Sequence, residues 1–222
     1  MKLFYCQLLI CVILFSCKKD EMVQATISEA RYTITVTGNW VSPFFTVPNN
    51  AHYTVFAGMV HNNNAFLWHE GRKASIGTET LAETGNTIPL LFEIDSMVAA
   101  KNAISLIAFI PPGITGQQSV NVYCNAIYSN ISFLSMLGPT PDWFIGINSL
   151  PLFNNNSWVN DTTINLYAYD AGTEDGDVLG YNNPATSPQE NIHLLLPSQA
   201  TVLANGNPLL APIARVRFER KY

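Results

Sequence analysis

Short runs in which polar and apolar residues alternate recur along most of the chain, and turn residues separate them. Residues 31–40 place Tyr32, Ile34 and Val36 on one face and threonines on the other, and Gly38 then begins a turn. Alternation with a period of two residues is typical of a β-strand that buries one face. Thirteen Gly and thirteen Pro residues, together with many Asn residues, bound these runs. The pattern therefore limits the chain to short strands joined by turns.

The later runs predict an antiparallel sheet protein of one domain. Further strands are expected at 53–60 and near 104–110, 119–127, 131–137, 143–149, 157–169 and 213–220. Many short strands with regular turn signals favour an all-β fold, an antiparallel β-sandwich of about eight strands in two sheets. A closed barrel is the alternative, because periodicity alone does not distinguish the two.

One segment has helical rather than strand periodicity. Apolar residues recur at helical spacing within 80–100, Thr87 can cap the first turn, and Pro89 suits a first helical position. We therefore expect one short helix near 88–100, covering one end of the sandwich. Residues 61–78 are rich in Asn, Gly, His and charge, and are expected to form a long loop.

The composition describes a chain that can bury a sizeable core. Hydrophobic residues make up 48 % of the sequence and charged residues only 12 %, with a formal net charge of −5. Before the last few residues there is no basic cluster, so nothing would neutralise a phosphate backbone. The basic tail, 215–221, alternates with apolar residues and predicts a final strand. Nucleic acid is therefore excluded as a partner.

The first seventeen residues have the features of an export signal. Lys2 supplies a positive charge, residues 8–15 are apolar, and the small Ser16 precedes Cys17. The apolar stretch is shorter than the roughly 18 to 20 residues of a spanning helix, which predicts a cleaved signal. Residues 14–17 resemble the lipobox of bacterial lipoproteins, and this resemblance implies cleavage before Cys17 and its acylation. An ordinary signal peptide is the alternative.

The lipobox interpretation divides the chain into a signal peptide, 1–16, a lipidated tether, 17–29, and one domain, 30–222. It predicts an exported protein that is lipid-anchored in the bacterial cell envelope, at the outer membrane or cell surface. The lipid would then be its only contact with a membrane. Cys124 is left without a disulfide partner, because the other cysteines lie within the signal or at the lipidation site. Neither a disulfide framework nor a zinc–cysteine site is expected.

Acidic residues are scarce, yet several gather near strand ends. Asp142 precedes an apolar strand, and the segment 169–177 contains Asp170, Glu174, Asp175 and Asp177 with two glycines among them. Calcium binds about six to eight oxygen atoms from carboxylates and backbone carbonyls, and glycines allow a loop to bend tightly around it. The spacing differs from that of the helix–loop–helix calcium motif. A calcium site and a solvated acidic turn are both consistent with these residues.

Two segments resemble motifs of one known family. Residues 141–147, Pro-Asp-Trp-Phe-Ile-Gly-Ile, resemble the Pro-Asp-Trp motif of the spondin domain. Residues 167–176, Tyr-Ala-Tyr-Asp-Ala-Gly-Thr-Glu-Asp-Gly, resemble its Tyr-x-Tyr-Asp-Ala-Gly-Thr-Asp-Ser-Gly. Shorter matches keep the family order at 37–40, 50–53, 61–62, 68–71, 74–77, 82–85, 158–159 and 184–188. The chain is identified, over about residues 30–195, as a member of the spondin domain family, the amino-terminal domain of F-spondin and mindin.

The resemblance implies a fold and a metal. The fold is an antiparallel β-sandwich similar to calcium-dependent membrane-binding domains, with a Ca²⁺ site at one end. By motif, the carboxylate ligands fall on Asp142, Asp170 and Glu174. The family pattern has Asp at the third position, where this chain has Glu, so Asp175 or a bridging water is the alternative third ligand.

The functional prediction is a non-enzymatic, surface-tethered calcium-binding protein for adhesion or protein binding. Its ligand would be an extracellular protein or a matrix or glycan component. The sequence contains neither a Gly-x-Ser-x-Gly elbow nor a phosphate-binding glycine loop. The rival is a secreted or surface glycan-binding or hydrolytic accessory module, which exposed aromatic side chains in a concave groove would favour. A membrane-directed calcium site is disfavoured, because residues 170–177 offer acids rather than basic or apolar loop tips.

Overall fold

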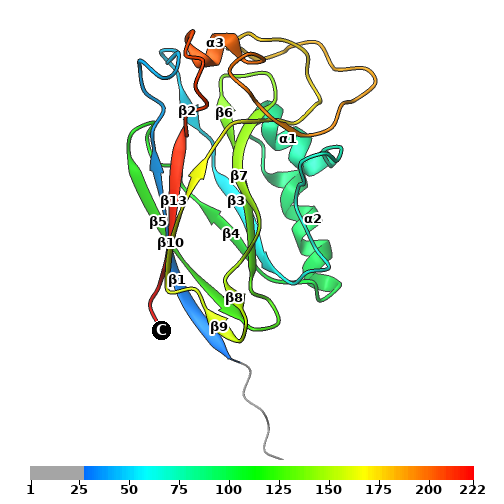
Figure 1. Cartoon of the computed structure of the whole chain (residues 1–222). Coiled ribbons are helices and arrows are strands. Elements are labelled where there is room, and N and C mark those ends of the chain that lie inside the picture. The colour runs from blue at the N-terminus through cyan, green and yellow to red at the C-terminus, as the bar shows by residue number, and fades with distance from the viewer. Residues whose placement is uncertain (1–27) are drawn as a thin grey trace, which may run out of the picture.

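The computed structural model describes residues 28–222, which form two antiparallel sheets packed face to face (Figure 1). The four-stranded sheet has the order β10 (Asp161–Leu166), β13 (Ala214–Arg220), β1 (Glu29–Gly38) and β5 (Gln117–Asn125). The larger sheet has the order β12 (His193–Leu194), β11 (Tyr169–Asp170), β7 (Trp143–Pro151), β6 (Asn130–Gly138), β3 (Phe56–His61) and β4 (Ala103–Phe109), with β2 (His52–Tyr53) also on β6. A small hairpin joins β8 (Phe153–Asn154) to β9 (Ser157–Trp158).

The expected antiparallel sandwich is confirmed, and the closed-barrel alternative is wrong because the two sheets remain separate. The alternating tail forms β13 as expected, but this last strand inserts between β10 and β1 in the middle of its sheet. Its burial alternates along the strand, and Val216 and Phe218 face the core opposite Val36 and Ile34 of β1. The end of the chain therefore completes the four-stranded sheet.

Two apolar clusters hold the layers together. The larger cluster lies between the sheets and includes Tyr32, Trp40 and Trp143. The smaller cluster lies between the outer face of the seven-stranded sheet and the helices, and includes Leu81, Leu90 and Phe144. Because β6 is buried on both faces, its sequence reads as a continuous run rather than an alternation. This second layer of packing fixes the ends of β6 and β7, where the candidate site lies.

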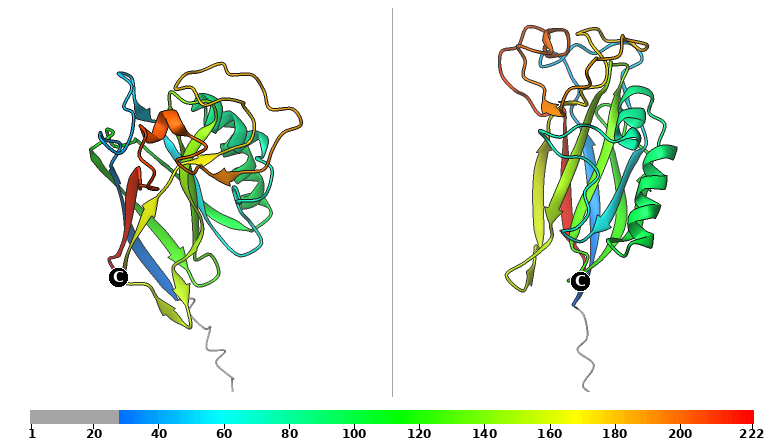
Figure 2. Two further views of the ribbon diagram at one scale, coloured as in Figure 1. Left: turned by 45° about the horizontal axis from the view of Figure 1, so that its top comes forward. Right: turned by 90° about the vertical axis from the view of Figure 1, so that its right-hand side faces the viewer.

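The helical segment is two helices, not one. Helix α1 (Ile76–Thr84) ends at Gly85 in a left-handed conformation, and α2 (Ile88–Ala99) begins with Pro89 in its first turn. A third, short helix, α3 (Thr201–Ala204), lies among the late loops. Both α1 and α2 pack on the outer face of the seven-stranded sheet rather than covering an end (Figure 2). Of the described helices, none is both long and apolar enough to cross a membrane.

A carboxylate from α2 caps the start of α1. Glu93 accepts hydrogen bonds from the Ser75 hydroxyl and the Gly77 N–H, each 2.7 Å long. Unpaired N–H groups at a helix start favour a negative partner, so this contact stabilises α1 and ties it to α2. A Cβ atom on Gly77 would lie 2.7 Å from both Glu93 Oε2 and Leu90 Cα, so only glycine allows the helices to approach this closely.

We predict that Gly77→Ala lowers the free energy of unfolding by about 1–3 kcal/mol, because the added methyl group overpacks the α1–α2 contact. Urea unfolding followed by circular dichroism measures the change. Gly113→Ala is the matched control, since a Cβ there meets only one atom, at 4.0 Å. Equal unfolding midpoints for the two variants would contradict the prediction.

Candidate metal centre

The fold brings the two predicted acidic segments together at one end of the sandwich. Asp142 lies in the turn between β6 and β7, and Asp170 ends β11, which pairs with β7 so that Asp170 is opposite Trp143. The backbone N–H of Ala171 then donates to the Asp142 carbonyl over 3.3 Å. The two loops that carry Asp142 and Asp170 are therefore in contact.

The Asp142 side chain is fully buried, and the described residues donate hydrogen bonds to one of its two carboxylate oxygens. Its Oδ2 atom accepts hydrogen bonds from the Thr173 N–H (2.7 Å), the Glu174 N–H (3.1 Å) and the Thr173 hydroxyl (3.1 Å). Its Oδ1 atom is buried with no hydrogen-bond partner among the described residues. A buried carboxylate oxygen without a donor is costly, and it is also the kind of oxygen that a hard cation binds.

Asp170 is held by the tight turn that follows it. Its Oδ1 accepts from the Gly172 N–H at 2.7 Å, and its Oδ2 accepts from the indole N–H of Trp143 at 3.2 Å. Gly172 has a φ of 74°, and a Cβ there would lie 2.6 Å from the Glu190 carbonyl oxygen. A residue with a side chain fits neither this backbone conformation nor this space.

Two further carboxylates lie near Asp142. Glu174 is half-buried, and its Oε2 accepts from the Asn183 side-chain amide at 3.4 Å. Glu83, on α1, lies close enough for its charge to act on Glu174 and for the Asp142 charge to act on it. Sequence reasoning missed Glu83 as a member of this group, although it stands in one of the matched family motifs, 82–85. Asp142, Asp170, Glu174 and Glu83 are called the acidic cluster below.

The environment disfavours negative charge at all four positions. Burial, together with the charge of the neighbouring Asp142, raises the pKa of Asp170 to about 6. Burial also raises the pKa values of Asp142, Glu174 and Glu83, and repulsion between these carboxylates adds to the increase for the two glutamates. The nearby His193 charge lowers the pKa of Asp170, but by less than burial and the Asp142 charge raise it.

The remaining predicted acids point elsewhere. Asp175 is exposed and its Oδ1 accepts from the Thr186 hydroxyl at 2.6 Å. Asp177 accepts from the hydroxyl of Thr201 and from the N–H of Val202, and so holds the start of α3. Within 28–222, no three His, Cys, Asp or Glu side chains are arranged around a common point as metal ligands. The cluster supplies suitable oxygen atoms, above all Asp142 Oδ1, without a preassembled three-carboxylate cage.

Comparison with known proteins identifies the family of the chain. Residues 30–205 match the Spondin_N family. The chain is 32 % identical over 205 residues to human spondin-2, covering 86 % of this chain and 61 % of spondin-2. It is 30 % identical over 203 residues to spondin-1 of Xenopus laevis, covering 86 % of this chain and 25 % of that protein. It thus spans about three fifths of spondin-2 and a quarter of spondin-1. The chain belongs to the spondin amino-terminal domain family.

We predict that removing the Asp170 charge has an effect that depends on pH when metal is absent. The native carboxyl, with a pKa near 6 against an ordinary 3.8, binds protons more tightly than the unfolded one. Its contribution to stability is therefore fully present below pH 4 and is lost as the pH rises through 6. When chelator has removed the metal, the free energy of unfolding of Asp170→Asn minus that of wild type should be larger at pH 7.5 than at pH 4.5.

Urea unfolding at both pH values measures this difference. The lost acceptor for the Trp143 indole gives Asp170→Asn a cost that does not change with pH, so only the change with pH is diagnostic. The exposed Asp95→Asn, on α2, is the control and should show no such change. A difference between Asp170→Asn and wild type that is the same at both pH values would contradict the prediction.

Proposed function

We propose that this chain is an exported, lipid-tethered spondin-domain protein that binds calcium at the acidic cluster and mediates adhesion or protein binding without enzymatic activity. The observation that carries the calcium proposal is Asp142 Oδ1, a buried oxygen with no hydrogen-bond donor among residues 28–222. Membership of the spondin family supports the adhesive role. The ligand would be an extracellular protein or a matrix or glycan component.

Calcium would offset the repulsion within the acidic cluster. Asp142, Asp170 and Glu174 would supply carboxylate oxygens, with Glu83 of α1 as a further candidate. Calcium tolerates irregular arrangements of carboxylate, carbonyl and water oxygens, whereas magnesium demands a near-ideal octahedron. The ion would act structurally, by neutralising charge where the loop after β11 folds over Asp142.

Among residues 28–222, one histidine–serine contact resembles a nucleophile and its base, and its inaccessibility supports the absence of enzymatic activity. His61 Nε2 is 2.8 Å from the Ser132 hydroxyl, while His61 Nδ1 is 2.7 Å from the Asn62 carbonyl oxygen. Both side chains are fully buried, so a substrate has no access to them. Burial lowers the pKa of His61, which keeps the ring neutral, and the contact links β3 to β6 as a structural hydrogen bond.

The position of β1 supports the tether. Cys17 lies outside the described residues, but β1 begins at the end of the sandwich opposite the loops that carry the acidic cluster (Figure 1). An anchor on the segment before β1 would therefore leave the acidic cluster directed away from the membrane. This orientation suits contact with a partner beyond the cell surface.

We predict that calcium raises the melting temperature of metal-stripped protein by about 5–10 °C at a hundredfold excess over its dissociation constant. Magnesium should raise it much less. Asp170→Asn should remove most of the shift, and Glu174→Gln less if a water takes its place. Differential scanning calorimetry in calcium, magnesium and chelator provides the measurement.

Asp95→Asn serves as the matched control, because Asp95 is an exposed aspartate on α2 outside the acidic cluster. It should retain the full calcium shift. Identical melting curves for the wild type in calcium and in chelator would refute the calcium site.

We predict that Cys17→Ser abolishes membrane fractionation and leaves uncleaved or soluble protein, because the lipid can no longer be attached. Cell fractionation and intact-mass analysis provide the measurement. Cys124→Ala is the control, since this buried thiol lies between the sheets and should not affect the anchor. A wild-type protein whose intact mass shows an unmodified start at another residue would rule out lipidation.

A further inference from the structure

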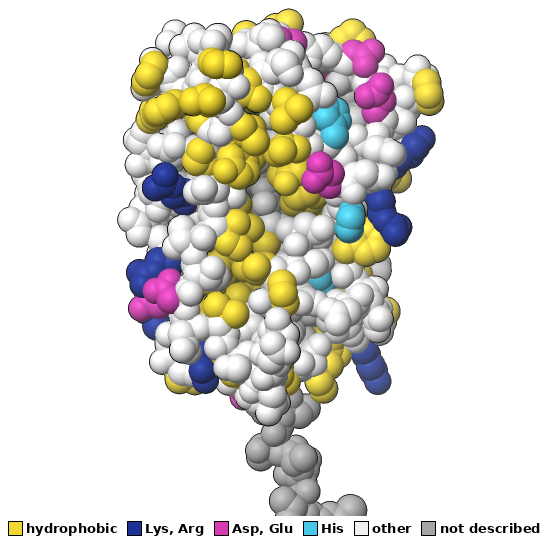
Figure 3. Space-filling model, in the orientation of Figure 1, with side chains coloured by type: hydrophobic (Ala, Val, Ile, Leu, Met, Phe, Trp, Pro, Cys, Tyr) yellow, Lys and Arg dark blue, Asp and Glu magenta, His cyan; other side chains and the backbone are white. Residues whose placement is uncertain are grey.

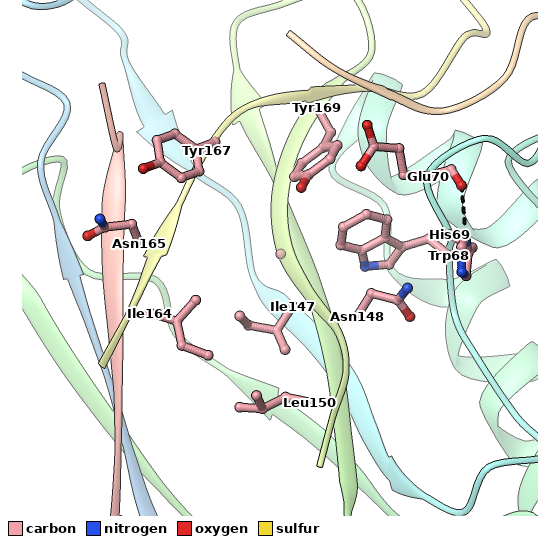
Figure 4. Close-up of a pocket in the computed structure, with 11 residues that line it drawn as sticks. Trp68, His69, Glu70, Ile147, Asn148, Leu150, Ile164, Asn165, Tyr167 and Tyr169 are labelled. Carbon is pink, nitrogen blue, oxygen red and sulfur yellow. Dashed lines mark hydrogen bonds between the residues drawn. The ribbon is translucent and has the colours of Figure 1, made fainter. Parts of the chain in front are cut away.

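A pocket of about 360 Å³ opens on the side of the sandwich where the two sheets part (Figure 4). One wall is β7, the opposite wall is β10 with the residues that follow it, and the loop before α1 closes the third side. The pocket exists because no strand in the described part of the chain bridges the two sheets here. β10 pairs only with β13, and β7 pairs with β11 only at Trp143 and Phe144. Below that short pairing, the two free edges face each other.

Aromatic rings form the upper part of the pocket. Trp68 packs edge-on against Phe144, with ring centres 5.1 Å apart, and lies 4.9 Å from the ring of Tyr169. Tyr167, from the segment after β10, lines the opposite side (Figure 4). Trp68 is fixed by these contacts and is only 5 % exposed, whereas both tyrosines are half-buried. Trp68 and the two tyrosines therefore line the upper part of the pocket with aromatic surface.

The lower part of the pocket is apolar, with polar groups around it. Ile147 of β7 and Ile164 of β10 approach each other from the two walls, and the amides of Asn148 and Asn165 lie on either side of this pair, directed away from it (Figure 4). Figure 3 shows apolar side chains running down the middle of this face of the molecule. A ligand that fits must offer apolar surface to the isoleucines and hydrogen-bonding groups to the amides.

One hydrogen-bond donor beside the pocket has no acceptor. The Nε1 atom of Trp68 is buried without a partner among the described residues, on the side of the indole that faces Asn148 (Figure 4). Leaving a buried N–H unpaired is costly, and tryptophan usually finds an acceptor when buried. An incoming oxygen atom, or the Asn148 amide turned by a ligand, would satisfy it.

The charge of the pocket limits what it can bind. None of the described residues that line it is Lys or Arg, and its carboxylate is Glu70. His69 uses its Nδ1 in a 2.7 Å contact with the Glu70 carbonyl oxygen. Because no lysine or arginine is among the described lining residues, a phosphate, sulfate or carboxylate group would be repelled by Glu70 without a basic side chain to attract it. The pocket therefore favours an uncharged, hydroxyl-rich ligand.

We propose that this pocket binds a neutral pyranose ring of a glycan. The C–H face of such a ring packs on aromatic and aliphatic side chains, because the negative face of an aromatic ring attracts the slightly positive hydrogens. Its hydroxyl groups both donate and accept, which matches the two asparagine amides, the Glu70 carboxylate and the Trp68 indole. The volume lies at the small end of the range for ligand pockets and suits one or two rings.

An extended peptide fits this place less well. Addition of a strand needs a regular free edge, but β7 carries a bulge here. Its pairing with β6 shifts register between Ile131 and Phe133, and Ser149 has a φ of 48°. The Ser149 N–H is turned to the Ser132 hydroxyl, 2.8 Å away. The edge is therefore interrupted at the level of the pocket.

The test uses full-length protein on an array of neutral glycans ending in glucose, galactose, mannose or N-acetylglucosamine, with sialylated and sulfated glycans beside them. Isothermal titration calorimetry with the free monosaccharide and with the oligosaccharide then separates binding of one ring from binding of a longer chain. We expect neutral glycans to bind and acidic ones to be rejected. Tyr167→Ala and Asn165→Ala should each weaken binding about tenfold, the loss of one stacking contact or hydrogen bond.

Matched controls lie outside the pocket. Thr163→Ala changes an exposed side chain two residues before Asn165 on β10, and Tyr181→Ala removes an exposed tyrosine of the loop after β11 that does not line the pocket. Both should bind like the wild type. The proposal is overturned if no neutral glycan binds, if acidic glycans bind more tightly, or if Tyr167→Ala and Asn165→Ala bind like the controls. None of these outcomes depends on whether calcium binds at the acidic cluster.

Discussion

The loop structure at one end of the molecule depends on the hydrogen bonds that the Asp142 carboxylate accepts. This carboxylate is fully buried, and three hydrogen bonds from Thr173 and Glu174 reach a single one of its oxygens. Burying a charge is costly unless it is paired or hydrogen-bonded, so the loop after β11 must wrap around this side chain for the domain to fold. The wrapping in turn places Asp170 and Glu174 beside it, and it leaves Oδ1 for a partner that the described residues do not supply.

The two-residue strand β11 connects this carboxylate to the rest of the molecule. Successive side chains of a strand point to opposite faces, so Tyr169 joins the rings beside the pocket while Asp170 joins the acidic cluster. Pairing with β7 anchors both. A change that loosens β11 would therefore disturb the cluster and the pocket together. The pocket opens where this pairing ends, because β7 then continues without a neighbour on that side.

Most strands were predictable from local signals, and the family resemblance implied that Asp142 and Asp170 share one site, whereas the rest required tertiary information. The alternation in β1 and β13 gave the correct strands, and the motifs placed Asp142 and Asp170 at strand ends. The break at Gly85 was hidden because apolar residues continue on both sides of it. Glu83 was missed because its neighbours in space lie some sixty to ninety residues further along the chain. Asp175 was a candidate by spacing alone, but Thr186 holds it at the surface.

The electrostatics of the cluster and the proposed location outside the cell support each other. Carboxylates whose pKa values are raised by burial make the native state less stable at neutral pH than at acidic pH, unless a cation is present. Extracellular calcium-binding modules work with dissociation constants of about 10⁻⁴–10⁻³ M, so such sites fill only where calcium is abundant. A domain with this cluster would therefore gain stability on export. Bound calcium would stabilise the acidic end at the cell surface. The pocket, whose described lining residues include no lysine or arginine, would bind its ligand independently of the ion.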